Sequence, residues 1–183
     1  IRLVPSLESP HRKLPESTVE HRLAMLRLAA LDFPGIVIDD REIVRGGLSY
    51  SVDTLESFRN EFGLRIAIYL IMGMDAFNKF DEWYRWRDIG CLCNIIVLKR
   101  PGNSSGFSSL MNRWMENSLC SLEQLQGRPG GKVCFVELEQ MDISSTEIRE
   151  ALRRGLKPSL QLPTKVENYI QVHGLYQGGY VNA

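Results

Sequence analysis

The apolar run VCFVELE (residues 133–139) leads into DISSTEIREALRRG (residues 142–155), so that a strand pattern is followed by a helix pattern. Ser144 is a suitable N-cap, and Glu147 stands three residues later as its capping-box partner. The apolar side chains that follow recur at helical spacing. We therefore predict a helix over about 145–154 behind a strand, which is the basic unit of an α/β protein.

The same alternation runs outward from this unit through the chain. Strand-like runs lie at 1–4, 36–39, 65–72, 94–98 and 132–138, and further helical patterns lie at about 18–31, 51–62, 108–119 and 163–174. The run RIAIYLIM (65–72) is apolar at consecutive positions, as in a central parallel strand that is covered on both faces. Short joints between strands and helices favour βαβ units. We predict an α/β fold with a parallel sheet and helices on both faces.

Two of the expected helices have identifiable start or face residues. Ser17 and Glu20 have capping-box spacing at the start of the first helix. In the second helix, Val52, Leu55 and Phe62 mark one apolar face, which we expect to be buried.

Charge and hydropathy narrow the classes of protein to which the chain can belong. Among 183 residues, 22 basic and 22 acidic side chains give a formal net charge of zero. No global field therefore attracts nucleic acid or an acidic membrane, and neither is expected as a partner. No apolar run is long enough to cross a bilayer, and the first residues do not form a signal peptide.

Four scattered cysteines are expected to be buried free thiols, because a free cysteine packs like a small apolar side chain. They are Cys91, Cys93, Cys120 and Cys134. The CxC spacing of the first two lacks the second Cys/His pair that would complete a zinc site. Free thiols favour a reducing, cytoplasmic location.

The start of the helix at 145–154 is a candidate phosphate site. The first turn of a helix has unpaired N–H groups and a partial positive charge. Ser145, Arg149 and Arg153 are four apart and share one face, and arginine binds phosphate oxygens through two hydrogen bonds. The alternative is a capped surface helix with solvated arginines.

Two loops that leave strands are further candidates, because ligands of parallel sheets lie beyond the carboxyl ends of the strands. His11 and Arg12 belong to SLESPHRK (6–13), where they could meet a phosphate or be solvated. Gly73 and Asp75 belong to GMDAF (73–77). Gly73 permits close backbone approach, and Asp75 could accept hydrogen bonds from a ribose or act as a helix N-cap.

The segment EWYRW (82–86) is the fourth candidate. Its Trp83 could stack on an aromatic ring of a ligand or belong to the core. The chain contains no GxGxxG, GxxxxGK[ST], HExxH or GxSxG sequence. Neither a dinucleotide fingerprint nor a P-loop accounts for the phosphate signals.

Taken in order, these segments resemble one family. IRLVP…PHR, EHRLAMLRLA, DDREIVRGGLSYSVDTL, IYLIMGMDAF, EWYRW, IIVLKRPG and ISSTEIR are together similar to the bacterial nicotinate mononucleotide adenylyltransferases. The resemblance covers nearly the whole chain. It implies a Rossmann-like, doubly wound parallel sheet of the nucleotidyltransferase type in a single domain, 1–183. It also implies adenylyl transfer from ATP to nicotinate mononucleotide, with Mg²⁺ on the ATP phosphates.

The resemblance assigns roles on the ATP side of the reaction. Ser144, Ser145 and Arg149 match the residues that hold the ATP phosphates, and Arg149 is also assigned to catalysis. Gly73 and Asp75 match the segment that contacts the adenosine ribose and the bound nucleotide.

Further roles concern the acceptor. Ser51 and Tyr84 match positions whose backbone amides receive the nicotinate carboxylate, and Trp83 matches the ring that stacks on the pyridine. Arg100 matches a basic residue of the KRP segment, on the same nicotinate mononucleotide side. Whether the acid is strictly preferred over the amide is left open.

His11 and Arg12 match the family's PHR segment beside the reacting phosphates and are assigned to catalysis. The family also begins with a strand and a GxFDPxHxGH loop, to which nothing in this chain corresponds. We expect that this segment precedes Ile1 in the full protein.

Two alternatives to this function remain open. One is a sister adenylyltransferase that uses another acceptor, such as pantetheine phosphate. The other is a non-catalytic nucleotide-binding domain that has the fold without the histidine loop. A homo-oligomer is also left open.

Overall fold

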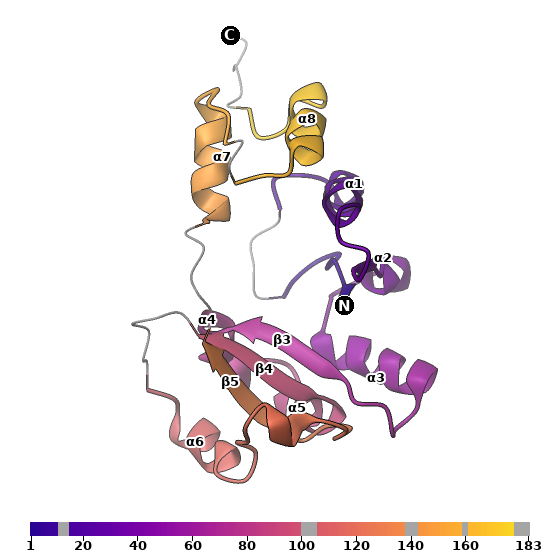
Figure 1. Cartoon of the computed structure of the whole chain (residues 1–183), viewed down its shortest axis with the longest axis vertical. Coiled ribbons are helices and arrows are strands. Elements are labelled where there is room, and N and C mark those ends of the chain that lie inside the picture. The colour runs from indigo at the N-terminus through magenta and orange to yellow at the C-terminus, as the bar shows by residue number, and fades with distance from the viewer. Residues whose placement is uncertain (11–14, 100–105, 138–142, 159–160, 178–183) are drawn as a thin grey trace. The chain divides into compact units, whose positions relative to one another are not determined.

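The structure is a computed structural model that describes residues 1–10, 15–99, 106–137, 143–158 and 161–177 (Figure 1). The chain divides into two compact units. Unit 1 comprises Ile1–Ser49 and Met141–Ala183, and unit 2 comprises Tyr50–Gln140. The single domain over 1–183 stays a prediction.

Unit 1 opens with a two-stranded parallel sheet. β1 (Arg2–Leu3) pairs with β2 (Val37–Ile38), and α1 (Val19–Ala30) lies between them in the chain. The short helix α2 (Arg41–Arg45), which was not predicted, follows β2. The strand–helix–strand order predicted for the first forty residues is confirmed, with strands shorter than expected.

The start of α1 corrects one prediction. Thr18, not Ser17, is the N-cap: its backbone is extended (φ −63°, ψ 164°), and its hydroxyl accepts the His21 N–H at 3.5 Å. Ser17 is buried and shares a hydrogen bond of 2.9 Å with the Tyr176 hydroxyl. The Ser17 hydroxyl, which the local spacing assigned to the helix cap, is thus hydrogen-bonded to a distant residue.

The C-terminal part of unit 1 consists of two helices that pack with α1. α7 (Ser145–Arg153) and α8 (Thr164–Val172) match the predicted ranges closely. Their buried apolar side chains form one cluster, against which α1 packs. The cluster contains Ile148, Leu152, Val166 and Ile170, and the α1 residues against it are Met25, Leu28 and Ala29.

Unit 2 is built on a three-stranded parallel sheet (Figure 1). Its strands are β3 (Tyr69–Gly73), β4 (Asn94–Lys99) and β5 (Val133–Glu137), in the order β3-β4-β5. The register places Gly73 opposite Leu98, and Lys99 opposite Glu137. Because the strands are parallel, their carboxyl ends lie at one edge of the sheet.

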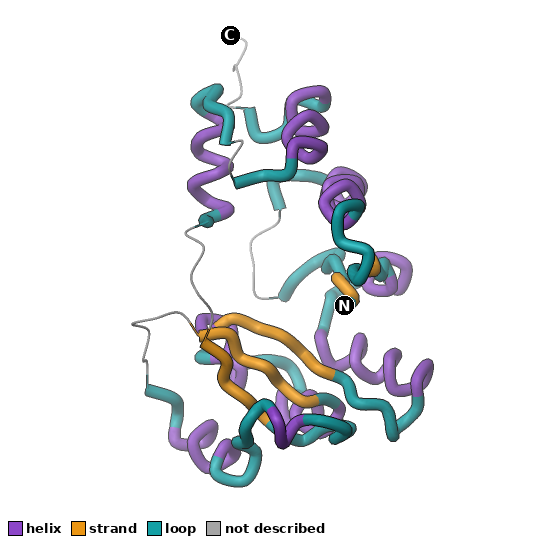
Figure 2. The backbone as a smooth tube through the Cα atoms, in the orientation of Figure 1, coloured by secondary structure: helices purple, strands orange, loops and turns teal. Residues whose placement is uncertain are grey.

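The helices of unit 2 alternate with these strands along the chain and lie outside the sheet (Figure 2). α3 (Ser51–Phe62) coincides with the predicted helix, whereas α6 (Ser109–Met115) is shorter than the predicted 108–119. Beyond the end of α6, the Ser118 carbonyl accepts the Val133 N–H at 2.8 Å, so this part of the predicted helix pairs with the start of β5. The elements not predicted are α4 (Met74–Phe77), α5 (Trp86–Leu92), and the 3₁₀ turns η1 (Phe80–Glu82) and η2 (Glu123–Leu125).

The prediction for RIAIYLIM was wrong in two respects. The strand begins at Tyr69 rather than at Arg65, and it lies at an edge of the described sheet, not at its centre. Ile71 is 48 % exposed, so the described residues do not cover both faces of β3. The central strand is β4, in which Ile95 and Val97 have no exposed surface.

One face of this sheet forms the core with the helices of unit 2. Val52 and Leu55 of α3 are buried there, as predicted. Phe62, predicted on the same face, is 38 % exposed, and Phe58 is buried instead, three residues after Leu55. The rest of the core is rich in aromatic rings, including Phe77, Phe80 and Trp86.

Arg59 of α3 is a buried cation, with 7 % of its surface exposed. Its Nε and Nη2 donate to the Leu92 carbonyl at 2.8 and 2.6 Å, and Nη2 also donates to Pro129 O at 2.7 Å. Nη1 donates to Ile66 O at 2.6 Å and Gly63 O at 3.1 Å. A single guanidinium therefore joins the end of α3 to the turns before β3, β4 and β5.

All four cysteines are free thiols, in agreement with the sequence. Cys93 and Cys134 are buried as predicted, and burial raises the pKa of the Cys93 thiol to about 12. Cys91 is exposed, so its predicted burial was wrong.

The predicted parallel α/β class is confirmed. None of the helices described is both long and apolar enough to span a membrane.

Candidate functional site

The start of α7 has the predicted capped geometry. Ser144 is the N-cap, with an extended backbone (φ −115°, ψ 121°), and its hydroxyl accepts the Glu147 N–H at 3.4 Å. The amides of Ser145 and Thr146 lie in the first turn, where no carbonyl of the same helix can reach them. These amides and the helix dipole favour an anion at this position.

Arg149 lies one turn further along α7 and is 34 % exposed. Its Nη2 is 3.4 Å from the Thr146 hydroxyl, which is a long hydrogen bond. Ser145 and Arg149 also line a cavity of about 160 Å³. The rest of its lining is mainly apolar, from Met25, Ile148, Leu152, Leu162, Val166, Ile170 and Tyr176. Ser145 and Arg149 thus lie on the same side of α7, beside an apolar hollow.

Arg153 lies on the same side of α7 as Arg149, as their contacts with one carboxylate show. Arg153 Nη2 is 2.6 Å from both oxygens of Glu16, and Arg149 Nε is 3.7 Å from one of them. The shared face predicted for these arginines is confirmed. Glu16 was missed, since only the tertiary fold brings it to α7.

At the carboxyl end of β3, Gly73 is the N-cap of α4 and Asp75 lies in the first turn of that helix. Asp75 is exposed and is not the N-cap. Gly73 has an ordinary φ of −78°, and a Cβ added to it would meet nothing within 4 Å. The backbone at Gly73 is therefore open to approach by a ligand.

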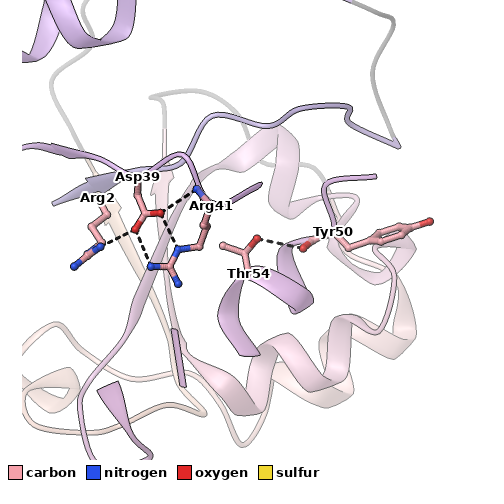
Figure 3. Close-up of polar contacts among 5 residues, drawn as sticks. All are labelled: Arg2, Asp39, Arg41, Tyr50 and Thr54. Carbon is pink, nitrogen blue, oxygen red and sulfur yellow. Dashed lines mark hydrogen bonds and ion pairs between the residues drawn. The ribbon is translucent and has the colours of Figure 1, made fainter. Parts of the chain in front are cut away.

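The start of α3 has no side-chain cap. Its N-cap is Tyr50, whose carbonyl accepts the Thr54 N–H at 3.4 Å and the Thr54 hydroxyl at 3.5 Å (Figure 3). Ser51 is the first helical residue, so its amide belongs to the unpaired first turn. This start could receive a carboxylate, as expected for Ser51.

The EWYRW segment is brought to this helix start. The ring of Tyr84 packs on that of Tyr50, with centroids 4.6 Å apart and planes inclined by 44°. Arg85 fixes the segment through ion pairs of 2.8 Å with Glu56 of α3 and 2.6 Å with Asp88. The structure thus brings Ser51 and Tyr84 together within unit 2. Arg85 itself is left-handed (φ 52°), which the sequence did not indicate.

Trp83 is partly buried and packs against the core of unit 2. Its ring centroid lies 5.7 Å from that of Phe80, with planes inclined by 58°. One side of the indole is therefore used in packing, and both the core and the stacking interpretation remain compatible with its position.

At the end of β2, one carboxylate is held by two arginines, a group that was not predicted from the sequence (Figure 3). Asp39 is 9 % exposed and accepts Arg2 Nη1 at 2.6 Å, and Arg41 Nε and Nη2 at 2.8 Å each. These hydrogen bonds, chiefly those from Arg41, lower the pKa of Asp39 to about 2. All its oxygens are thereby engaged within unit 1, which indicates a structural role.

His11, Arg12 and Arg100 lie outside the described residues. In the part of the chain that is described, no group of three His, Cys, Asp or Glu side chains could hold a metal ion. A larger hollow of about 370 Å³ in unit 2 is lined by Tyr69, Ile96 and residues of the η2 region, and none of the described candidate residues lines it.

Comparisons with known proteins agree with the resemblance. The family model described as cytidylyltransferase-like matches residues 1–151. A relative from Hahella chejuensis, named probable nicotinate-nucleotide adenylyltransferase, is 42 % identical over 100 % of this chain and 83 % of its own length. A relative of the same name from Pseudomonas syringae pv. tomato is 38 % identical over 97 % of this chain and 80 % of its own length.

Solved structures agree in fold. The Plasmodium falciparum nicotinic acid mononucleotide adenylyltransferase complexed with NaAD matches with a TM-score of 0.67 and 15 % identity, over 96 % of this chain and 81 % of that one. The same enzyme complexed with APC matches with a TM-score of 0.63. The predicted nucleotidyltransferase type of fold is confirmed. The chain belongs to the cytidylyltransferase-like family, in its branch of nicotinate-nucleotide adenylyltransferases.

Proposed function

We propose that this chain transfers the adenylyl group of ATP to nicotinate mononucleotide, giving nicotinate adenine dinucleotide and pyrophosphate. The family membership supports this reaction. The structural observation that carries the proposal is the start of α7, where a capped first turn and the one-third exposed Arg149 lie beside a cavity. That combination suits a nucleoside polyphosphate.

In this proposal the start of α7 holds the ATP phosphates. The amides at Ser145 and Thr146 donate to phosphate oxygens, and Ser144 keeps the helix start in place through its bond to Glu147. Arg149 adds a charged, bidentate donor that stabilises the negative charge of the transition state. Gly73 and Asp75 contact the nucleotide from the end of β3, where the backbone is open.

Nicotinate mononucleotide binds in unit 2. The unpaired amide of Ser51 at the start of α3 and the backbone amide of Tyr84 receive the nicotinate carboxylate. Their proximity, shown by the Tyr50–Tyr84 ring pair, supports this assignment. Trp83 stacks on the pyridine ring, and Arg100 belongs to the same side of the reaction. An amide has no negative charge for these donors, so the acid is preferred.

The reaction needs no nucleophile from the protein. A phosphate oxygen of the mononucleotide forms a bond with the α-phosphorus of ATP, and the bond from that phosphorus to the bridging oxygen breaks as pyrophosphate leaves. Catalysis then consists of positioning and charge stabilisation, with His11, Arg12 and Arg149 beside the reacting phosphates. Mg²⁺ enters on the ATP phosphates and supplies further charge neutralisation there. The free thiols support a cytoplasmic setting for this reaction.

The direct test is pyrophosphate release by the full-length protein with ATP and Mg²⁺. Nicotinate mononucleotide, nicotinamide mononucleotide and pantetheine phosphate are offered separately as acceptors. We expect release with the nicotinate compound and much slower release with the other two. Faster release with pantetheine phosphate would identify the sister enzyme, and ATP binding without release with any acceptor would identify a non-catalytic binding domain.

A further inference from the structure

Glu16 of unit 1 contacts two arginines of α7, and it lies much closer to one of them than to the other. Both of its oxygens are 2.6 Å from Arg153 Nη2. One oxygen is 3.7 Å from Arg149 Nε, which is within ion-pair range but too long for a hydrogen bond. The carboxylate is therefore held by Arg153 and stands next to Arg149 without occupying its donors.

The remaining contacts of Arg149 leave its guanidinium available. Among the described residues, its only hydrogen bond is the long one of 3.4 Å to Thr146. A phosphate oxygen could replace that bond at little cost, because it would offer a charged acceptor. Among the described residues, Glu16 is the carboxylate within ion-pair range of Arg149, so it is the anion that competes for this guanidinium.

We propose that Arg153 is a positioning residue that holds the Glu16 carboxylate and so keeps Arg149 free for the phosphates of ATP. This inference rests on the proposed function, in which Arg149 binds ATP. Arg153 acts through Glu16, not through the nucleotide. Without Arg153, Arg149 is the described cation that remains within ion-pair range of Glu16, and the carboxylate pairs with it, so that ATP must displace a carboxylate before it binds.

Stability does not explain the arrangement. The side chains of Glu16, Arg149 and Arg153 are 49 %, 34 % and 38 % exposed, and ion pairs at such positions contribute little to folding. Their strength is nevertheless sufficient to decide which cation a mobile carboxylate approaches. The pair thus affects the availability of Arg149 more than the stability of α7.

A direct role of Arg153 gives a different expectation. If Arg153 itself attracts or contacts the phosphates, its removal weakens ATP binding whether or not Glu16 is charged. If Arg153 acts by holding Glu16, neutralising Glu16 removes the penalty. The two roles are separated by combining the substitutions.

The experiment measures the Kd of the full-length protein for Mg²⁺–ATP by calorimetry, in wild type, Arg153→Ala, Glu16→Gln and the double variant. We expect Arg153→Ala to raise the Kd about three- to fivefold, the range of a partly exposed ion pair. Glu16→Gln is expected to bind as tightly as wild type or more tightly, and the double variant is expected to match Glu16→Gln. A double variant as weak as Arg153→Ala would overturn the proposal.

Two further variants control for charge. Arg154→Ala removes the same charge from the C-cap of α7, where Arg154 is exposed and is not one of the two arginines paired with Glu16. Its Kd should equal that of wild type; a rise equal to that of Arg153→Ala would show a general charge effect and overturn the proposal. Arg153→Lys keeps a cation beside Glu16 and should bind ATP normally. Loss of binding in Arg153→Lys would contradict the positioning role.

Failure of the proposed function gives a distinct pattern. A wild-type protein that binds ATP but releases no pyrophosphate contradicts the proposed reaction. The four Kd values then still test whether Arg153 acts by holding Glu16. An active wild type in which the double variant is not rescued contradicts only the inference. A wild type that binds no ATP contradicts both.

Discussion

Arg59 in unit 2 and Arg149 in unit 1 show two opposite uses of the same side chain. Arg59 is buried, and its donors reach four backbone carbonyls at 2.6–3.1 Å. Arg149 is one-third exposed and has one long hydrogen bond among the described residues. The N–H donors of Arg59 are used in hydrogen bonds within the protein, whereas most N–H donors of Arg149 remain available to a ligand.

Asp39 and Glu16, two carboxylates of unit 1, differ in the same way: one is buried with its oxygens engaged, and the other is partly exposed. Asp39 is 9 % exposed and is held by two arginines, so its pKa falls to about 2. Glu16 is half exposed and stands beside a second cation that it does not fully engage. The buried charges thus have their hydrogen-bonding capacity used within the fold, whereas the exposed charges of α7 and Glu16 have capacity left, as the proposed function requires.

The largest effect should come from Arg59→Met. Removal of the guanidinium leaves four carbonyls without their donor in a buried setting, which should destabilise the protein by about 3 kcal/mol or more. Thermal denaturation measures this loss. Arg113→Met is the matched control, because Arg113 is exposed on α6. Equal melting temperatures for the two variants would show that the carbonyl contacts of Arg59 contribute nothing.

Arg149→Ala should leave stability intact and reduce activity. Loss of one charged donor to the transition state typically lowers kcat/KM by about a hundredfold, and we expect that effect for ATP. The melting temperature should stay within one or two degrees of wild type, in contrast to Arg59→Met, since about 0.5 kcal/mol is typical of surface substitutions. Steady-state kinetics with varied ATP test this, and an unchanged kcat/KM would remove Arg149 from the site.

Asp39→Asn should cost about 2 kcal/mol of stability at pH 7, because the folded pKa of about 2 lies below the ordinary aspartate value of 3.8. The lowered pKa means that this contribution is fully present above about pH 5 and is lost as pH falls toward 2. Urea denaturation between pH 7 and pH 3 should therefore show the wild type approaching the variant. Asp32→Asn, at an exposed ion pair with Lys165, should show little pH dependence. A constant gap between Asp39→Asn and wild type across this range would contradict the saturated role of Asp39.

The smallest effect concerns Trp83, which packs on Phe80 and is also proposed to stack on the pyridine. Trp83→Ala should raise the KM for nicotinate mononucleotide about fivefold, the value of one aromatic pair, and change the KM for ATP less. Trp83→Phe keeps a ring in the same place and should recover most of the loss. Equal increases for both substrates would indicate a core residue without a stacking role.

Local patterns in the sequence predicted those elements whose ends depend on neighbouring residues. The Ser144 cap and the limits of α3 and α7 agree with the structure because capping and apolar spacing act within a few residues. The same reasoning placed the N-cap of α1 at Ser17 and not at Thr18. It missed the hydrogen bond that the Ser17 hydroxyl shares with the distant Tyr176 hydroxyl.

Features that depend on the whole fold were not accessible from the sequence. RIAIYLIM has the composition of a covered central strand, but its place in the sheet follows from strand order and not from its residues. The contact of Glu16 with α7 joins residues 137 positions apart. The candidate residues themselves were found from helix starts, strand ends and the family resemblance. The arginine and carboxylate networks around them required coordinates.

The reach of Arg59 has a consequence for how the protein is made. Its Nη2 bonds to a carbonyl 70 residues further along the chain, at Pro129. At the usual pace of translation, the ribosome needs roughly 4 to 14 s to synthesise that distance. Late in this interval the carbonyls of Gly63, Ile66 and Leu92 are already present, and only the acceptor at Pro129 is missing. The complete set of hydrogen bonds to Arg59 should therefore form only after Pro129 has been synthesised, late in the folding of unit 2.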